Sequence, residues 1–215
     1  MRRAPLVVLL VLLFPAASNA QISVRVFGEA GATVFTATQS FKAILGTPFG
    51  PVYGGGLEFR QRQYFFSVRA QRFRRTGHRV FVFENQIFTL NVKDTITVTP
   101  LDLTFGYRFL RRAAAGRFRR PPRLVPYAGG GIGAYRYEEI SEHATDAENV
   151  KKGYAGYHVL GGAEVPLRPW LGAAFEAQWA TVPHALGDSS TGVANVYDEH
   201  NLGGFTLRAK IVIGR

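Results

Sequence analysis

Three segments near the C-terminus alternate between apolar and polar residues with a period of two. They cover residues 155–165, 171–179 and 205–213. In the third segment the apolar residues are Phe205, Leu207, Ala209, Ile211 and Ile213, and the polar ones are Thr206, Arg208 and Lys210. Because successive side chains of a β-strand point to opposite faces, this period predicts strands. One face of the resulting sheet is continuously apolar, and the other carries charges in mid-strand.

The N-terminus has the pattern of a cleaved secretion signal. Two arginines at positions 2–3 precede an apolar run at 6–14, and the small residues Ser18 and Ala20 stand at the −3 and −1 positions. We therefore expect cleavage before Gln21. The apolar run is too short to span a bilayer as a helix, and no later stretch is long and apolar enough. An exported chain of this kind spans a membrane as a closed barrel or not at all.

Length and composition are consistent with one barrel domain. A signal peptide at residues 1–20 leaves 21–215 as the barrel domain, enough for about eight to ten membrane strands with loops. The absence of cysteine excludes a lipid-modified cysteine anchor and disulfides. The formal net charge of +11, or +9 without the signal peptide, indicates an anionic partner. We expect outer-membrane lipid and lipopolysaccharide, no nucleic acid, and no cofactor or metal.

The alternation extends along the exported chain, and it predicts an antiparallel up-and-down barrel of eight strands. We predict strands at about 22–35, 52–60, 64–74, 95–109, 124–138, 155–165, 171–179 and 205–213. The long connections are 36–51, 75–94, 139–153 and 183–200, and the short ones are 61–63 and 166–169. Since outer-membrane barrels have short periplasmic turns and longer outside loops, we expect the N-terminus inside and the four long connections outside.

Two stretches are less regular. Residues 79–99 predict either a β-extension of the second long loop or two further strands, so a ten-stranded barrel is an alternative. Residues 110–123 stand where a periplasmic turn is expected, yet they are long and strongly basic. This basic periplasmic turn contains Arg111, Arg112, Arg117, Arg119, Arg120 and Arg123. We expect either contact with anionic headgroups or cell-wall polymer, or a solvated linker.

The polar face predicts a charged lumen. An eight-stranded barrel has an interior just wide enough for side chains to fill, and buried charges are costly unless they pair. We therefore expect a plugged, hydrogen-bonded charge network, with a narrow ion-conducting path as the alternative. Its predicted members are Arg25, Glu29, Glu58, Arg60, Arg69, Asp102, Arg108, Arg136, Glu138, Glu164, Glu176, Arg208 and Lys210.

The apolar face predicts a lipid-facing belt rich in aromatic residues, as is typical of membrane barrels. The predicted belt contains Tyr53, Phe59, Tyr64, Phe66, Phe105, Tyr107, Phe109, Tyr127, Tyr157, Phe175, Trp179 and Phe205. In the segment 124–138, this assignment places Tyr127, Tyr135 and Tyr137 on the lipid side. It places Arg136 in the lumen.

Three runs of sequence resemble a known family. They are residues 100–109, 126–135 and 161–170. Together they resemble the small outer-membrane β-barrel proteins of Gram-negative bacteria, which include the OmpA-, OmpX-, OmpW- and opacity-type barrels. The resemblance implies a monomeric, porin-like transmembrane barrel that is inserted by the barrel assembly machinery. The chain departs from the family pattern at residues 213–215, where the usual terminal aromatic residue is missing.

These observations favour a non-enzymatic barrel with a structural or surface-interaction role. A small-solute or hydrophobic-ligand channel of the OmpW type is one alternative, and a lipid A-modifying enzyme is another. The nearest candidate for such chemistry is His184 with Asp188, Ser189 and Ser190. Its spacing differs from that of the His and Ser in lipid A deacylases, so we assign no catalytic residue. A soluble lipocalin-like barrel would have the apolar face inside.

Overall fold

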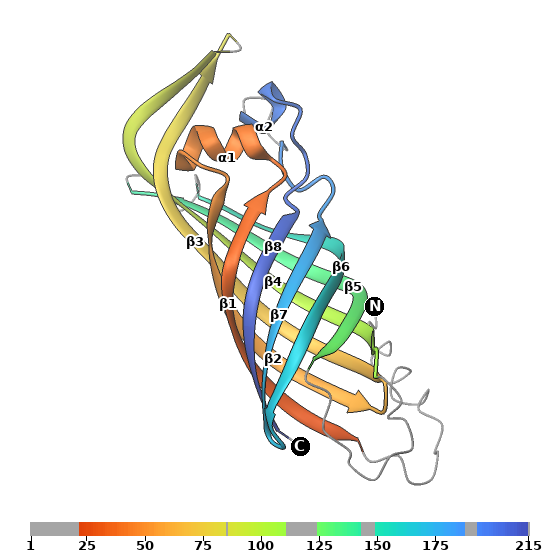
Figure 1. Ribbon diagram of the computed structural model, residues 1–215. Helices are drawn as coiled ribbons and strands as arrows, with labels where there is room; N and C mark the ends of the chain where they lie inside the picture. Colours follow the sequence, from red (N-terminus) through yellow and green to blue (C-terminus); the bar gives the residue numbers. More distant parts are fainter. Residues whose placement is uncertain (1–21, 85, 111–123, 143–148, 188–192, 215) are drawn as a thin grey trace, which may run out of the picture.

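A computed structural model shows an eight-stranded barrel with two short helices at one end (Figure 1). The structure describes residues 22–84, 86–110, 124–142, 149–187 and 193–214. The expected signal peptide and the basic periplasmic turn therefore lie outside the described residues. No helix in the described part of the chain is long and apolar enough to cross a membrane.

The strands follow one another in sequence order around the barrel. Their bounds are β1 Ser23–Phe35, β2 Phe49–Gln61, β3 Tyr64–Phe83, β4 Gln86–Arg108, β5 Val125–Ser141, β6 Val150–Arg168, β7 Leu171–Thr181 and β8 Gly204–Gly214. Every neighbouring pair is antiparallel. The predicted up-and-down barrel of eight strands is confirmed, and the ten-stranded alternative is not.

The barrel closes through pairing of the first strand with the last. Val26 of β1 is opposite Leu57 of β2 on one side and Ile213 of β8 on the other. A closed ring leaves no strand edge with unpaired backbone groups. This is the arrangement that β-structure requires inside a bilayer.

The hairpin of β3 and β4 rises beyond the other strands (Figure 1). Residues 79–99, which left the strand number open, belong to this hairpin and lengthen it. The two strands keep pairing up to Phe83 and Gln86, with one irregularity between His78 and Val80. The second long connection is therefore mainly β-structure rather than an irregular loop.

The barrel has two different ends. One end contains the start of β1, the end of β8 and the tight turns at 62–63 and 169–170. We call it the terminal end. We call the opposite end, with helices α1 (Thr38–Leu45) and α2 (Val193–Val196), the loop end. Helix α1 ends at Gly46, whose φ of 76° is in the left-handed region that glycine adopts without a steric cost.

An apolar cap fills the barrel beneath α1. The ring of Phe41 in α1 stacks on Phe35 with ring centroids 4.1 Å apart, and Phe35 packs edge-on against Phe73. The cap is made of Phe35, Ala37, Phe41, Leu45, Val52, Phe73, Ile96, Val98, Tyr135, Tyr137, Ala180, Val182, Ala185 and Leu202. This cap separates the loop end from the polar interior below it.

Candidate functional site

Most of the predicted lumen charges lie inside the barrel. Eleven of them point inward, namely Arg25, Glu29, Glu58, Arg60, Arg69, Asp102, Arg108, Glu164, Glu176, Arg208 and Lys210. They come from seven of the eight strands and meet across the lumen. The described interior therefore contains a buried salt-bridge network.

Glu176 of β7 is the centre of this network. Its carboxylate accepts hydrogen bonds from Arg69 at 2.7 Å, from Nε of Arg208 at 2.9 Å and from Lys210 at 3.3 Å. The hydroxyl of Tyr127 donates a fourth bond at 2.9 Å. The Glu176 side chain is 1 % exposed. Three cations thus share this one buried carboxylate.

Amide side chains extend the network to the neighbouring strands. Arg69 also contacts Glu29 at 3.1 Å and donates to the Gln178 amide oxygen at 2.9 Å. The Gln71 amide donates to Glu29 at 2.7 Å, and that of Gln178 donates to Asp102 at 3.2 Å. The network therefore links β1, β3, β4 and β7 across the barrel.

A histidine in the interior was not among the predicted network members. His158 of β6 is 2 % exposed, and its Nε2 lies 2.9 Å from the hydroxyl oxygen of Thr104. Its Nδ1 lies 3.8 Å from the Asp102 carboxylate. The alternation of β6 puts this residue on the polar face. Only the three-dimensional pairing with β4 shows which partners it meets.

A second group of charges lies toward the terminal end. Glu164 of β6 accepts a hydrogen bond from Arg25 at 2.8 Å and one from Arg60, while Arg108 lies 3.7 Å away. Arg60 also pairs with Glu58. This group has three arginines and two carboxylates, so cations are in excess here.

Strand β5 has the opposite facing from the one predicted, and five assignments are wrong for this reason. Arg136 and Glu138 lie on the outside, where they pair at 2.7 Å, and the Arg136 side chain is 67 % exposed. Tyr127 lies inside with 7 % exposure and is not part of the lipid belt. Tyr135 and Tyr137 are also buried inside.

Facing glycines explain why these tyrosines fit inside. A Cβ atom at Gly162 would lie 2.6 Å from the Tyr127 ring, and one at Gly156 would lie 3.0 Å from the Tyr135 ring. Each ring therefore occupies space that only a glycine leaves free. Inside the barrel, Tyr127 also finds a partner for its hydroxyl in Glu176, as buried tyrosines usually require.

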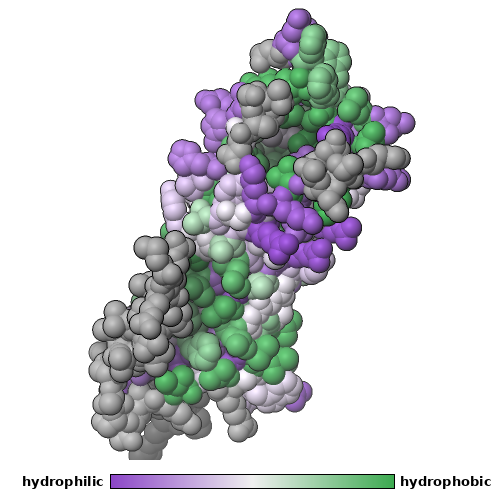
Figure 2. Space-filling model, turned by 180° about the vertical axis from the view of Figure 1, so that it is seen from behind, coloured by the Kyte–Doolittle hydropathy of each residue, from purple (hydrophilic) through white to green (hydrophobic). Residues whose placement is uncertain are grey.

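The other aromatic residues of the predicted belt lie on the outer surface. They are Tyr53, Phe59, Tyr64, Phe66, Phe105, Tyr107, Phe109, Tyr157, Phe175, Trp179 and Phe205. Several contact each other on neighbouring strands, such as Tyr64 and Phe105 with ring centroids 5.9 Å apart. Figure 2 shows a largely hydrophobic zone on the barrel wall below a hydrophilic zone.

A basic band lies directly above this belt on strands β3 to β6. We define it by Arg72, Arg74, Arg136 and Lys151, all exposed. Cross-strand pairing connects them, because Arg74 is opposite Thr97, Thr97 is opposite Glu138, and Glu138 is opposite Lys151. Next to the band is an open groove of about 700 Å³, lined by Leu101, Ala134, Arg136, Lys151, Gly153 and Ala155, among others.

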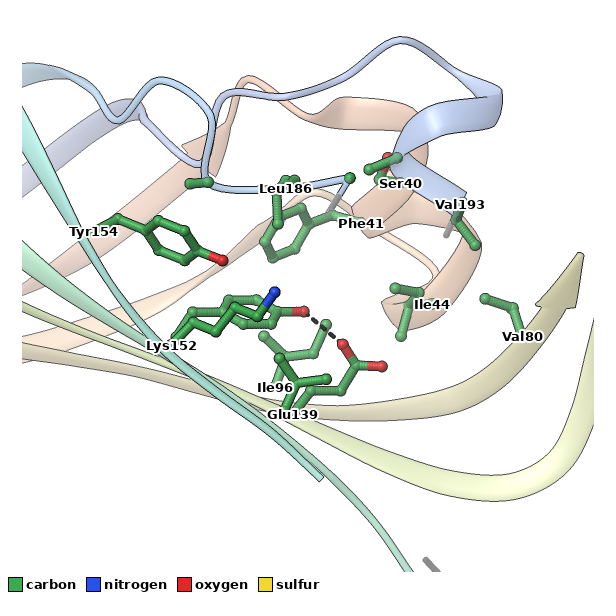
Figure 3. A pocket seen from close by; sticks show the side chains of 15 residues that line it. Ser40, Phe41, Ile44, Val80, Ile96, Glu139, Lys152, Tyr154, Leu186 and Val193 are labelled. Carbon is green, nitrogen blue, oxygen red and sulfur yellow. Dashed lines mark hydrogen bonds between the residues drawn. The ribbon is translucent and has the colours of Figure 1, made fainter. Parts of the chain in front are cut away.

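A pocket of about 240 Å³ lies at the loop end, between the helices and the rim of the barrel (Figure 3). Phe41 and Ile44 of α1 form one wall, and Glu139, Lys152 and Tyr154 project from β5 and β6 on the other. Most of the lining is apolar, so the pocket combines an apolar wall with a few polar groups. The sequence did not predict it, because its walls come from distant segments.

The carboxyl group of Glu139 at this pocket has a raised pKa. Burial and the nearby Asp94 carboxyl together raise the pKa of Glu139 to about 7. The hydroxyl of Tyr137 donates a hydrogen bond to it at 2.8 Å. Glu139 lies above the lipid-facing belt, beyond the row that contains Arg136.

We predict that the loop end loses stability as the pH rises. The pKa of Glu139 is about 7 in the folded protein and about 4.3 in an unfolded chain. The folded state therefore binds more protons between these values, and its free energy of unfolding falls as the pH rises from about 4.5 to 7. Urea unfolding across this range should show the decline in the wild type and less of it in Glu139→Gln. The exposed Glu142→Gln is the control, and parallel curves for all three proteins would refute the assignment.

No cluster of three or more potential metal ligands is present among the described residues. The sequence offered His184 with Asp188, Ser189 and Ser190 as the nearest candidate for hydrolase chemistry. Of these residues, only His184 is described, with a left-handed φ of 55°. Asp188, Ser189 and Ser190 lie outside the described residues. The described part of the chain thus brings no nucleophile and base together at this position.

A closed ring with a charged interior and an aromatic outer belt defines a transmembrane β-barrel. Solved structures agree with this class. The barrel is similar to the crystal structure of neisserial surface protein A, with a TM-score of 0.54, 12% identity, and coverage of 90% of this chain and 97% of that one. This likeness confirms the fold of the small outer-membrane β-barrels.

Two further solved structures are similar over almost the whole barrel. The N-terminal β-barrel domain of Pseudomonas aeruginosa OprF has a TM-score of 0.48 and 12% identity, with coverage of 90% of this chain and 97% of that one. A major outer membrane protein from Thermus thermophilus has a TM-score of 0.45 and 12% identity, with coverage of 89% and 99%. No protein-family model matches the sequence, and no curated protein matches it.

Proposed function

We propose that this protein is a non-conducting, non-enzymatic barrel of the outer membrane with a structural or surface-interaction role. The filled lumen carries this proposal. In the middle of the lumen, a cavity beside Gln71 and Gln178 has a volume of about 40 Å³ and one beside Tyr127 and Lys210 a volume of about 10 Å³, and a cavity needs about 10–15 Å³ to hold one water molecule. The charge network and the apolar cap lie between the two ends.

The proposed orientation has the terminal end in the periplasm and the loop end outside. Long loops face outward in outer-membrane barrels, and the loop end carries α1, α2 and the β3–β4 extension. The signal peptide at residues 1–20 would export the chain, and the barrel assembly machinery would insert it as a monomer. The pocket beside Glu139 and the extension would then be open to the cell exterior.

Planar bilayer recordings test whether the barrel conducts. Protein whose gel mobility shifts on heating, and which is therefore folded, should give no stepwise current above that of protein-free bilayers. A porin reconstituted in the same way is the positive control. Reproducible conductance steps would favour the alternative, a small-solute channel of the OmpW type, and would mean that the network rearranges in the membrane.

The basic band suggests the partner of the outer surface. Its cations lie just above the lipid-facing belt, at the level where lipid phosphates are expected. The adjoining groove is lined by small residues such as Ala134 and Ala155, which leave space for an acyl chain. We propose that the band binds the phosphate groups of lipopolysaccharide in the outer leaflet.

Native mass spectrometry of the protein with lipid A tests this partner. A Lys or Arg near a membrane surface contributes about 1 kcal/mol to binding anionic lipid. We therefore expect Arg136→Gln/Lys151→Gln to lower the affinity for lipid A about tenfold or more. Lys42→Gln/Lys93→Gln is the control, because it removes the same charge from exposed positions outside the band. An equal loss in both double variants would show that only net charge matters.

A further inference from the structure

The terminal end holds a second pocket, with a volume of about 320 Å³. Its lining includes Arg25, Arg60, Arg62, Arg108 and Arg168, with Glu164 as the single carboxylate. The arginines come from β1, β2, the β2–β3 turn, β4 and the end of β6, so segments far apart in sequence deliver them to one place. We call this the terminal arginine pocket.

The cations in this pocket exceed the anions that they contact. Glu164 is already bonded to Arg25 and Arg60, and it lies 3.7 Å from Arg108. Among the described residues, the only other carboxylate contact of these arginines is that of Arg60 with Glu58. Neither Arg62 nor Arg168 has an ion pair with any residue in the described ranges. The pocket therefore has an excess of positive charge.

Part of this charge is buried without a complete set of partners. The Arg25 side chain is 9% exposed, yet its Nε has no hydrogen-bond partner among the described residues. The Nε of Arg108 is also buried and unsatisfied within the described part of the chain. Buried donors on charged groups are costly when they are left unpaired. An anion in the pocket would offset part of this charge through the guanidinium groups that line it.

The backbone conformation of Arg62 places another arginine at the pocket. This residue has a φ of 56° in the tight turn between β2 and β3. Glycine or asparagine would adopt this conformation at a lower steric cost. A two-residue hairpin turn commonly requires a positive φ at its first central position. Here the turn holds a guanidinium group at the rim of the pocket.

We propose that the terminal arginine pocket binds a phosphate-bearing anion. Planar guanidinium groups bind phosphate oxygens through paired, charge-assisted hydrogen bonds, and several of them converge here. In the proposed orientation, the anion is either the headgroup of an anionic phospholipid in the periplasmic leaflet or a soluble phosphate compound. The proposal goes beyond the proposed function and holds whether or not the barrel conducts.

Titration calorimetry on the full-length protein folded in dodecyl maltoside micelles tests the proposal, because this detergent contains no phosphate. One arm uses inorganic phosphate at constant ionic strength. The other uses dihexanoyl phosphatidylglycerol, with dihexanoylglycerol, which has no phosphate, to measure the contribution of the chains. We expect Arg108→Gln/Arg168→Gln to weaken binding at least tenfold. If that variant fails to show the heat-dependent gel shift of a folded barrel, the exposed pair Arg62→Gln/Arg168→Gln takes its place.

The outcomes distinguish the two sources of phosphate. Saturable binding of inorganic phosphate that the variants weaken supports a soluble ligand. Binding of the phosphatidylglycerol alone, with the same loss in the variants, supports a lipid headgroup. Lys42→Gln/Lys93→Gln removes the same charge elsewhere and should change either affinity less than twofold. Absence of binding in both arms, or an equal loss in this control, would overturn the proposal.

Discussion

Replacing Glu176 with leucine is expected to destabilise the folded barrel by about 3–5 kcal/mol, the range for removing one partner of a buried ion pair. Leucine has a volume similar to that of glutamate but leaves Arg69, Arg208 and Lys210 without their shared carboxylate. Water cannot easily replace it, because the Glu176 side chain is 1% exposed. Urea unfolding of protein refolded into lipid vesicles measures the change.

The control for this experiment is Glu138→Gln. Glu138 also pairs with an arginine, Arg136, but on the outer surface, where the arginine is 67% exposed. Exposed pairs contribute about 0–1 kcal/mol, so the loss should stay below about 1 kcal/mol. If the Glu176 variant lost no more stability than this control, the buried network would not hold the barrel together.

A charge on the lipid-facing side of β5 is expected to have the second-largest effect. Ile132 is 64% exposed and lies between Leu103 of β4 and Tyr157 of β6, within the lipid-facing belt. Arginine near the bilayer midplane of a membrane barrel costs about 2–4 kcal/mol. We therefore expect Ile132→Arg to lower the free energy of unfolding from lipid vesicles by about that amount.

Ile140→Arg is the matched control on the same strand. Ile140 is also exposed and has the same facing as Ile132, but it lies beyond Arg136, above the belt. Near the membrane interface the cost of an arginine falls to about 0–1 kcal/mol. Equal losses at the two positions would mean that the belt does not end where the basic band begins.

The barrel itself could be predicted because charge and apolarity separate cleanly on most strands. On β8, Arg208 and Lys210 alternate with Leu207, Ala209 and Ile211. A one-residue shift would turn the charged side chains toward the lipid and the apolar ones into the lumen. The number of strands follows only from the pairing of the strands in the structure. Whether residues 79–99 add strands or lengthen a hairpin depends on which partners β3 and β4 have, and alternation does not determine this.

Strand β5 could not be oriented from its own residues. Tyrosine is amphipathic and suits either a lipid interface or a polar interior, and Arg136 pairs with Glu138 as well outside as inside. The deciding residues are on other strands. Gly162 provides the space for Tyr127, and Glu176 provides its hydrogen-bond partner.

The pockets at the two ends also could not be predicted from the sequence. The Glu139 pocket has walls from α1, α2 and four strands, and the terminal arginine pocket joins residues from five strands and two turns. The sequence predicted the strong positive charge and a basic periplasmic turn, but not the terminal arginine pocket. Helix α1 was predicted as part of a long connection, since an eight-residue helix has little signal of its own.

The measurement that tests the central claim most directly is a spin-label scan of β5 in lipid vesicles. The chain has no cysteine, so single cysteines can be introduced along residues 126–137 without other changes. Labels at Ala128, Ile132 and Ala134 should be highly accessible to lipid-soluble oxygen, and those at Tyr127 and Tyr135 should not. The opposite alternation, or a barrel that stays soluble without detergent, would contradict a charged lumen inside a lipid-facing wall.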